Sequence, residues 1–294
     1  MPGRRALHHF PYVSFVRVGN AKCTPFPLLP AGCIWKIQEG DKRMIEEISV
    51  DFFGEDSDDF SCEIMIEGLP GVGQVGKLAA EHLMEELGAE KIAEIRSIFF
   101  PPQVLVDEKG VAHLPKNEIY RYSDGEKSIM FLIGDFQSGS AEGHYILTDT
   151  YLDIAEKLGV KRIYTLGGYG VGHLIEDIRV IAAVNDEKLE EEVVNAGAVF
   201  SQDEPGGGII GASGLLLGLG AKRGIEGICL MGETSGYIVD PKSSNCLLEV
   251  LSKMLDINID STKLQERASE MEVFLERLKT MDQAKTEDEL SYIG

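Results

Sequence analysis

Gly68-Leu69-Pro70-Gly71-Val72-Gly73-Gln74-Val75-Gly76-Lys77 is the stretch of sequence that decides the fold. Residues 62–67 before it are mostly apolar and predict a strand, and residues 74–87 carry apolar side chains at helical spacing. A glycine-rich turn that joins a strand to a helix indicates a βα unit. Three glycines of the turn fit the G-x-G-x-x-G pattern of dinucleotide-binding turns, namely Gly71, Gly73 and Gly76.

This pattern has two interpretations. Backbone amides at a helix N-terminus attract phosphate, so the turn could hold a dinucleotide or another anion. The expected acid after the next strand is poorly placed, however, because Glu94 falls within that strand and Asp107 follows Pro101-Pro102. A Walker A loop is also incomplete, since Lys77 is followed by Leu78 instead of Ser or Thr. We favour a structural role, in which glycines permit a tight turn and close packing of helix on strand.

Composition narrows the class of protein. The chain has 294 residues, of which 44% are hydrophobic, and its net charge is −21. We expect no membrane partner, because no apolar run is long enough to span a bilayer, and no nucleic-acid partner, because that needs a basic face. The cysteines form no metal-binding spacing, which predicts reduced thiols and a cytoplasmic protein. These cysteines are Cys23, Cys33, Cys62, Cys229 and Cys246.

We divide the chain into four parts. Residues 1–43 are basic and proline-rich, and we interpret them as a disordered arm, a non-native addition before Met44, or a structured cap. Residues 44–260 form an α/β domain. Residues 261–281 predict an amphipathic helix with a heptad seam, which packs on the body or on a partner subunit. Residues 282–294 predict a flexible acidic tail.

Within residues 44–260, strand and helix patterns alternate with short connections, which indicates an α/β fold with a mostly parallel sheet. Two hairpins, over 103–114 and 118–134, add antiparallel strands, so the sheet should be mixed. We expect a helix over 148–158 and a strand over 162–166 that ends at the next glycine-rich loop.

Polar residues that follow these strands are candidate ligand groups. Asp135 and Gln137 follow one predicted strand, and Glu233 follows another. Glu67, Asp135, His173 and Glu233 together could coordinate a metal or transfer protons, and Gln137 could orient a ligand. No spacing requires that chemistry, and no nucleophile lies in a nucleophile elbow, so we expect no catalytic residue, no metal and no cofactor.

Five motifs in this order resemble the proteasome assembly chaperone 2 family, in its archaeal branch: residues 67–76, 134–137, 166–169, 211–216 and 232–237. The resemblance implies a three-layer α/β sandwich similar to purine nucleoside phosphorylases. It also implies a homo-oligomer without a catalytic site that binds the proteasome core particle or its α-subunits. Such sequences have been described as related to ATP-grasp enzymes, but this chain shows no nucleotide loop or metal-binding acid pair that supports the description.

Some archaeal relatives dock through a C-terminal hydrophobic–Tyr–any tripeptide. This chain resembles that motif at Leu290, Tyr292, Ile293 and Gly294, which we take as partner-binding residues, but the tyrosine stands third from the end instead of second. One residue of extended chain shifts the ring by about 3.3 Å and turns it to the opposite face. Weak or altered docking and a disordered end therefore both stay open.

We conclude that the chain is a non-enzymatic proteasome assembly chaperone-like protein or proteasome-binding adaptor, with a tail whose reach is about 20 Å. The alternative is a nucleotide- or phosphometabolite-binding enzyme, or a small-molecule sensor. It would use the glycine-rich loops with Gly71, Gly73, Gly76, Asp135, Gln137 and Glu233.

Overall fold

The structure is a computed structural model that describes residues 46–53, 61–200, 207–271 and 273. The predicted N-terminal arm, residues 1–43, and the predicted tail, residues 282–294, lie outside the described residues. No helix within the described ranges is long and apolar enough to cross a membrane.

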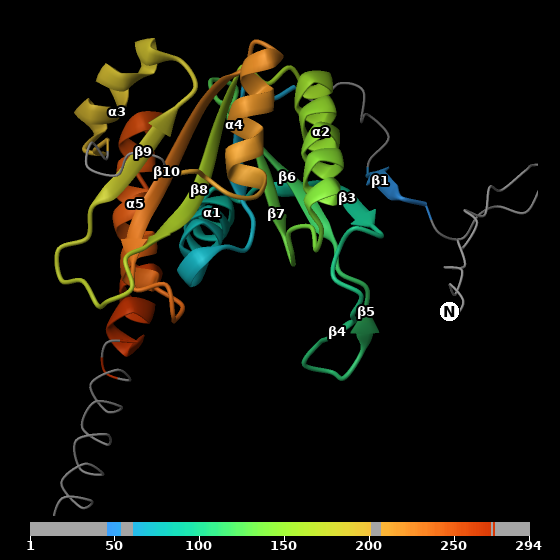
Figure 1. Cartoon of the computed structure of the whole chain (residues 1–294), viewed down its shortest axis with the longest axis horizontal. Helices are drawn as coiled ribbons and strands as arrows, with labels where there is room; N and C mark the ends of the chain where they lie inside the picture. The colour runs from blue at the N-terminus through green and yellow to red at the C-terminus, as the bar shows by residue number, and fades with distance from the viewer. Residues whose placement is uncertain (1–45, 54–60, 201–206, 272, 274–294) are drawn as a thin grey trace, which may run out of the picture. The chain divides into compact units, whose positions relative to one another are not determined.

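An eight-stranded mixed sheet forms the centre of the domain (Figure 1). Its four central strands are parallel, and the strands on both flanks run antiparallel to their neighbours. In spatial order the strands are β1 (Ile48–Phe52), β3 (Glu90–Ser97), β6 (Asn117–Ser123), β7 (Ser128–Gly134), β2 (Ile64–Gly68), β8 (Arg162–Gly170), β10 (Glu226–Thr234) and β9 (Val180–Val184).

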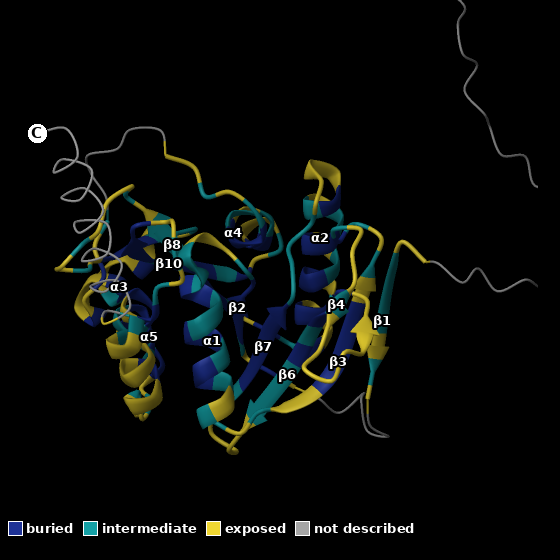
Figure 2. Cartoon of the chain, turned by 90° about the horizontal axis from the view of Figure 1, so that it is seen from below, coloured by how far each residue is buried: buried dark blue, intermediate teal, exposed yellow. Residues whose placement is uncertain are grey.

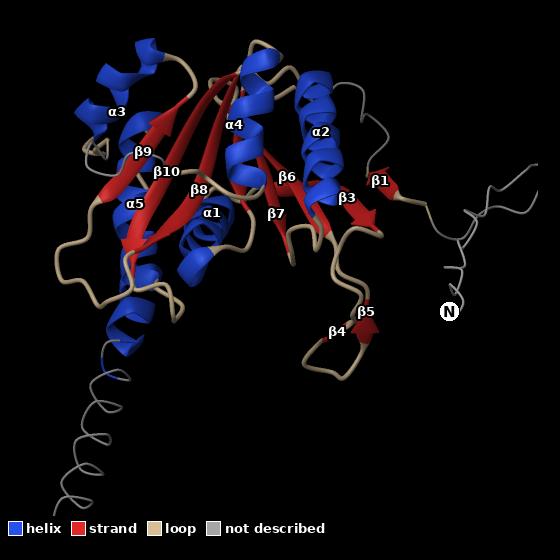
Figure 3. Ribbon diagram, viewed as in Figure 1, coloured by secondary structure: helices blue, strands red, loops and turns tan. Residues whose placement is uncertain are grey.

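Helices cover both faces of this sheet (Figures 2 and 3). One face carries α2 (Ala141–Leu158) and α4 (Ala212–Lys222). The other carries α1 (Val75–Glu86), α3 (Glu190–Ala196) and α5 (Pro241–Leu255). Short 3₁₀ turns, η1 (Val72–Gln74) and η2 (Glu187–Leu189), precede α1 and α3. The predicted three-layer α/β sandwich with a mixed sheet is confirmed, and the parallel pairings are confined to the four central strands.

Two buried clusters fill the spaces between the layers. Alternation along β2 sends Ile66 into the cluster under α1 and α5 and Met65 into the cluster under α2 and α4. The same rule applies in β7, where Phe131 and Leu132 enter different clusters. Because both faces are covered, these strands are apolar on both sides, as parallel strands usually are.

Two element ends differ from the sequence-based prediction. Helix α2 begins at Ala141, not near 148, because the Ser140 side chain accepts a 3.1 Å hydrogen bond from Gly143 N and caps the helix. Strand β8 continues through the glycines to Gly170, since they pair in register with β10 up to Thr234.

The C-terminal helix packs on α1 at its beginning. Residues 262–271 are helical, and Leu264 is fully buried in the cluster under α1 and α5. Lys263 Nζ lies 2.8 Å from Glu86 Oε1, and the His82 ring contacts Asp260 O at 2.8 Å. These contacts favour packing on the body for the first turns of the predicted seam.

Candidate functional site

The carboxyl ends of β2, β7, β8 and β10 meet at one edge of the sheet, where α/β proteins usually place their sites. The glycine-rich turn and the loops after β7 and β10 all lie there. The structure therefore brings the predicted residues Gly71, Asp135 and Glu233 to the same edge, together with their neighbours in those loops. Leu290, Tyr292, Ile293 and Gly294 lie outside the described residues.

Packing accounts for two glycines of the turn. A Cβ on Gly76 would lie 2.0 Å from Leu166 O, so α1 approaches β8 more closely than any other residue would allow. Gly73 has φ +61°, and its carbonyl accepts a 2.9 Å hydrogen bond from Asp240 N. The turn is thus pressed against the ends of β8 and β10, which supports the structural interpretation of the pattern. A ligand role for Gly71, Gly73 and Gly76 stays a prediction.

Gln137 joins two loops that are far apart in sequence. Its Nε2 donates to Pro70 O at 2.8 Å, and its Oε1 accepts from Ala212 N at 3.0 Å. The amide therefore ties the glycine-rich turn to the first turn of α4. Both ends of the side chain are engaged within the protein, so the described contacts give Gln137 a structural role.

Glu67 is completely buried at the end of β2. Its Oε1 accepts from Leu69 N at 3.0 Å, and its Oε2 accepts from Ser213 Oγ at 2.8 Å. Burial raises the pKa of the Glu67 carboxyl to about 7, although the hydrogen bonds from Leu69 and Ser213 oppose the shift. A carboxyl that titrates near neutral pH thus lies directly beneath the glycine-rich turn.

Glu233 is also buried but differs from Glu67 because it has a charged partner. Arg179 Nε donates to Glu233 Oε2 at 2.9 Å, a second guanidinium nitrogen donates to Oε1, and Arg179 N donates to Oε2. These side-chain hydrogen bonds hold the pKa of Glu233 below its ordinary value. The Arg179–Glu233 ion pair holds the loop between β8 and β9 against the end of β10. Sequence reasoning identified Glu233 but missed Arg179.

An open groove of about 510 Å³ lies beside the turn on the α1 face. Its size is within the range of small-ligand sites. Lys77, Glu81 and Asp135 supply its charges, and Lys77 Nζ also donates to Gly134 O at 3.0 Å. Its apolar lining comes from Pro70, Leu78, Phe136 and Val239. We call this hollow the α1 groove.

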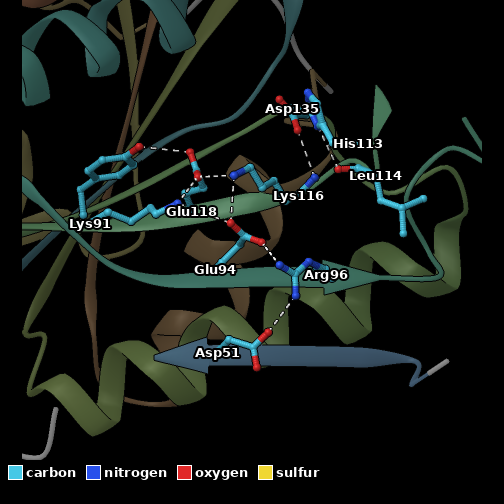
Figure 4. Close-up of polar contacts among 10 residues, drawn as sticks. Asp51, Lys91, Glu94, Arg96, His113, Leu114, Lys116, Glu118 and Asp135 are labelled. Carbon is cyan, nitrogen blue, oxygen red and sulfur yellow. Dashed lines mark hydrogen bonds and ion pairs between the residues drawn. The ribbon is translucent and has the colours of Figure 1, made fainter. Parts of the chain in front are cut away.

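A network of charged side chains adjoins this groove on β1, β3 and β6 (Figure 4). Lys116 Nζ lies 2.9 Å from Glu94 Oε2 and 2.8 Å from Glu118 Oε1, while Lys116 N donates to Asp135 Oδ2. Arg96 contacts both Glu94 and Asp51. Burial acts to raise the pKa of Glu94, but hydrogen bonds and charges led by Lys116 outweigh it and leave the pKa lowered. Alternating signs thus neutralise this face.

Large apolar side chains are exposed around the same edge of the sheet. Tyr237 and Ile210 have exposed fractions of 80% and 92%, and Val72 and Leu174 are also exposed. Val72 packs beside Gly170 and Gly236, so the glycine-rich turn lies against the end of β8 and the loop after β10. Ile210 lies just before α4, whose Ala212 N is bonded to Gln137 at the same edge. We call Val72, Leu174, Ile210 and Tyr237 the apolar rim. Exposed apolar groups that cluster in this way are typical of protein–protein contact sites.

A two-stranded hairpin extends beyond this edge, which we call the β4–β5 arm, residues 103–114 (Figure 1). It contains β4 (Leu105–Val106) and β5 (Ala112–His113), as the sequence predicts. Asp107 shapes its turn, because Oδ1 accepts from Lys109 N and Val111 N. Four large apolar residues of the arm are more than half exposed: Val104, Val106, Val111 and Leu114.

Metal chemistry gains no geometric support from the described residues. Within 46–53, 61–200, 207–271 and 273, no group of three or more His, Cys, Asp or Glu could hold a metal ion. Glu67 and Glu233 are instead engaged by Ser213 and Arg179.

The three-layer sandwich, the glycine-rich βα turn and the buried carboxylates at the carboxyl end of its parallel strands place the chain among the α/β proteins. Residues 65–279 match the model of the PAC2 family, and the chain belongs to that family.

Solved structures and curated sequences agree with this assignment. Pyrococcus furiosus PbaB, an archaeal proteasome activator, is 40% identical with a TM-score of 0.75, and the match covers 80% of this chain and 100% of that one. P. furiosus PbaA, an archaeal homolog of proteasome-assembly chaperone, is 28% identical with a TM-score of 0.67, over 84% and 98% of the two chains. An uncharacterized protein of Methanocaldococcus jannaschii is 40% identical over 240 residues, 79% of this chain and 92% of that protein.

Proposed function

We propose that this protein is a non-enzymatic, homo-oligomeric adaptor or chaperone-like protein that binds the proteasome core particle or its α-subunits. The similarity to PbaB supports the class of partner, since that relative is a proteasome activator. The apolar rim is the observation that carries the proposal, because it exposes Ile210 and Tyr237 on loops at the edge of the sheet where α/β proteins usually bind their partners or ligands.

The arrangement of polar groups at the same edge also supports a binding function. Gln137 is bonded to Pro70 and Ala212, and Glu233 is bonded to Arg179, so these side chains stabilise loops. Rigid loops present an apolar surface at a low entropic cost of binding, because they are already ordered.

We propose a contact in two parts. The apolar rim packs against the partner, and the C-terminal residues Leu290–Gly294 dock separately at the end of the acidic tail. A tethered second contact raises the effective concentration of the first, and an oligomer repeats both contacts around a ring of subunits.

Co-sedimentation with purified proteasome core particle tests the proposal. The variants are the full chain, a chain that ends at Glu289, Tyr237→Asp, and the matched control Val194→Asp, whose exposed valine lies on α3 away from the rim. We expect at least tenfold weaker binding for the truncation and for Tyr237→Asp, and unchanged binding for the control.

Each outcome is informative. If truncation leaves binding intact, the tail is not a docking element and the body carries the contact. If the full chain binds neither the core particle nor free α-subunits, the proposed function is wrong. Thermal shift with nucleotides and phosphorylated metabolites then tests the enzyme or sensor alternative, because a bound ligand stabilises the native state.

A further inference from the structure

The C-terminal helix, residues 262–271, leads from the end of α1 to the α1 groove. Lys263 Nζ lies 2.8 Å from Glu86 Oε1 in the last turn of α1. Burial raises the pKa of the Glu81 carboxyl, and the charge of Arg267 acts against that shift. Because charges near a protein surface act over short distances, Arg267 lies near Glu81, which lines the groove. The helix therefore runs toward the groove and reaches its wall at Arg267.

The apolar seam of this helix continues in the sequence that follows it. Leu264 is fully buried, and Ala268 and Met271 are half-buried, so these three residues lie on the side that faces the body. Leu275 and Leu278 follow with the same alternating spacing of four and three. At helical spacing they share the face that already packs on the body.

We propose that residues 274–281 of this chain lie in the α1 groove of the same chain. These residues begin one heptad after Arg267, which corresponds to about 10 Å of helix. Along α1, one heptad in the opposite direction leads from Glu81 to Gln74, and both line the groove. A helix that continues its course therefore carries Phe274 from Glu81 along the length of the groove.

The groove leaves apolar groups partly in water. Leu78 and Phe136 are half-buried, and Val239 is exposed. Residues 274–281 contain four large apolar side chains, so docking removes apolar surface from water on both sides of the contact, which is favourable.

Charge distinguishes this segment from the rest of the C-terminal sequence. The groove has one cation and two anions, namely Lys77, Glu81 and Asp135. Residues 274–281 have two cations and one anion, whereas residues 282–294 have one cation and four anions. The groove therefore attracts the first segment and repels the second.

Glu81 in particular lacks a close cation in the described contacts. Lys77 Nζ is 3.6 Å from Glu81 Oε1, but it lies closer, at 3.0 Å, to Gly134 O. Arg277 belongs to the docked segment and brings a second cation to the groove. Residues 1–43 are also basic, but they precede β1, which β3 and β6 separate from β7 and its loop. The C-terminal segment therefore has the shorter path to the groove.

Docking fixes where the acidic tail leaves the body. Gly71 and Asp135 line the groove and lie at the edge of the sheet that carries the apolar rim. With residues 274–281 in the groove, Asp282 emerges beside that rim, and the two contacts of the proposed function become neighbours. This consequence rests on the proposed function, whereas the docking itself does not.

Hydrogen exchange with mass spectrometry on the full chain tests the docking, with no proteasome present. We expect residues 274–281 to exchange at least tenfold more slowly than residues 284–292, because packed amides open rarely. Val239→Lys adds a cation to the groove and should raise the exchange of residues 274–281 at least tenfold. Val194→Lys is the matched control, because its valine is similarly exposed but lies on α3.

Acetylation of lysines tests the same contact from the side of the groove. Phe274→Asp removes the leading apolar side chain of the segment, and we expect it to make Lys77 at least threefold more reactive. Lys188 is the internal reference, since it lies in η2, away from the groove, and its reactivity should not change. Circular dichroism checks that each variant is folded.

Three results would overturn the inference. The first is exchange of residues 274–281 as fast as that of the tail in the wild-type chain. The second is protection that Val239→Lys leaves unchanged, or Lys77 reactivity that Phe274→Asp leaves unchanged, because the segment would then lie elsewhere. The third is protection that increases with protein concentration, which would place the segment on another copy. Co-sedimentation tests the proposed function separately, so either proposal can fail alone.

Discussion

Ser213 Oγ donates a 2.8 Å hydrogen bond to Glu67 Oε2, although the two residues are 146 positions apart in the sequence. The bond joins the end of β2 to the first turn of α4. The other carboxyl oxygen holds Leu69 N, so one buried side chain fixes both the glycine-rich turn and the helix that faces it. Ile210 of the apolar rim lies three residues before Ser213, and its position therefore depends on this buried contact.

The ionised form of Glu67 should destabilise the fold. The pKa of Glu67 is about 7 in the folded protein, above the ordinary value of 4.5. The stabilisation that protonated Glu67 gives the fold is therefore complete below pH 4.5 and is lost as pH rises through 7. Glu67→Gln keeps an acceptor for Leu69 N and gains a donor to Ser213 Oγ. We expect it to be more stable than wild type at pH 8 by up to about 3 kcal/mol, with no advantage at pH 4.

Urea unfolding of both proteins from pH 4 to 8 measures this difference. Glu108→Gln is the control, because Glu108 is exposed at the tip of the β4–β5 arm. A difference between Glu67→Gln and wild type that does not change with pH would show that the carboxyl does not titrate in this range.

Gly76→Ala should strongly destabilise the protein. The added methyl would overlap Leu166 O at 2.0 Å, and backbone on both sides would have to move. We expect a loss of about 3 kcal/mol in the free energy of unfolding. Gly218→Ala is the matched test, since nothing lies within 4 Å of its Cβ position in α4. It should stabilise by about 0.5–1 kcal/mol. Equal effects at both positions would refute the steric argument.

Gln137→Glu should loosen two segments together. The carboxylate cannot donate to Pro70 O, so a 2.8 Å hydrogen bond becomes a repulsion between two oxygens. We expect faster amide exchange at Leu69, Gly71 and residues 209–213, and a loss of about 1–3 kcal/mol in the free energy of unfolding. Hydrogen exchange with mass spectrometry measures the local effect, with Gln103→Glu on the exposed arm as the control. Faster exchange in only one of the two segments would argue against the view that Gln137 holds both segments together.

Arg179→Ala should destabilise the protein by leaving a buried carboxylate without its partner. With Arg179 present, the lowered pKa of Glu233 adds stability above pH 4.5 that is lost as pH falls through the folded pKa. Without Arg179, burial should raise the pKa of Glu233, so stability should be lost as pH rises instead of as pH falls. Adding Glu233→Gln to Arg179→Ala should recover part of the loss at pH 8, as measured by thermal unfolding. A double variant no more stable than the single one would contradict this account.

Much of the fold could be predicted from local patterns. The strand before Gly68, the turn and the helix after it are encoded within residues 62–87, and both hairpins have their turn residues between alternating strands. Strand order could not be predicted, because the pairing of β2 with β7 and β8 joins distant segments through buried apolar faces that are interchangeable in sequence. The start of α2 was missed because Gly143 and His144 resemble a loop until Ser140 is recognised as the cap.

The candidate site was less predictable than the fold. The loops that carry Asp135, Gln137 and Glu233 were identified, since polar groups after parallel strands meet at one edge. The role of Gln137 could not be inferred, because its partners Pro70 and Ala212 are distant in sequence. The burial of Glu67 was equally hidden, since an acid at the end of a strand gives no local sign of whether α4 covers it.

The position of β1 has a consequence for how this architecture can vary. Among the described residues β1 pairs only with β3 and forms one outer edge of the sheet, and the match to the family model begins at residue 65, after β1. A segment joined along one side can be lengthened, exchanged or lost during evolution while the parallel centre keeps its pairing. The N-terminal side of the domain is therefore open to divergence, whereas the glycine-rich turn is held in place by Glu67, Gln137 and Asp240 and has less freedom to change.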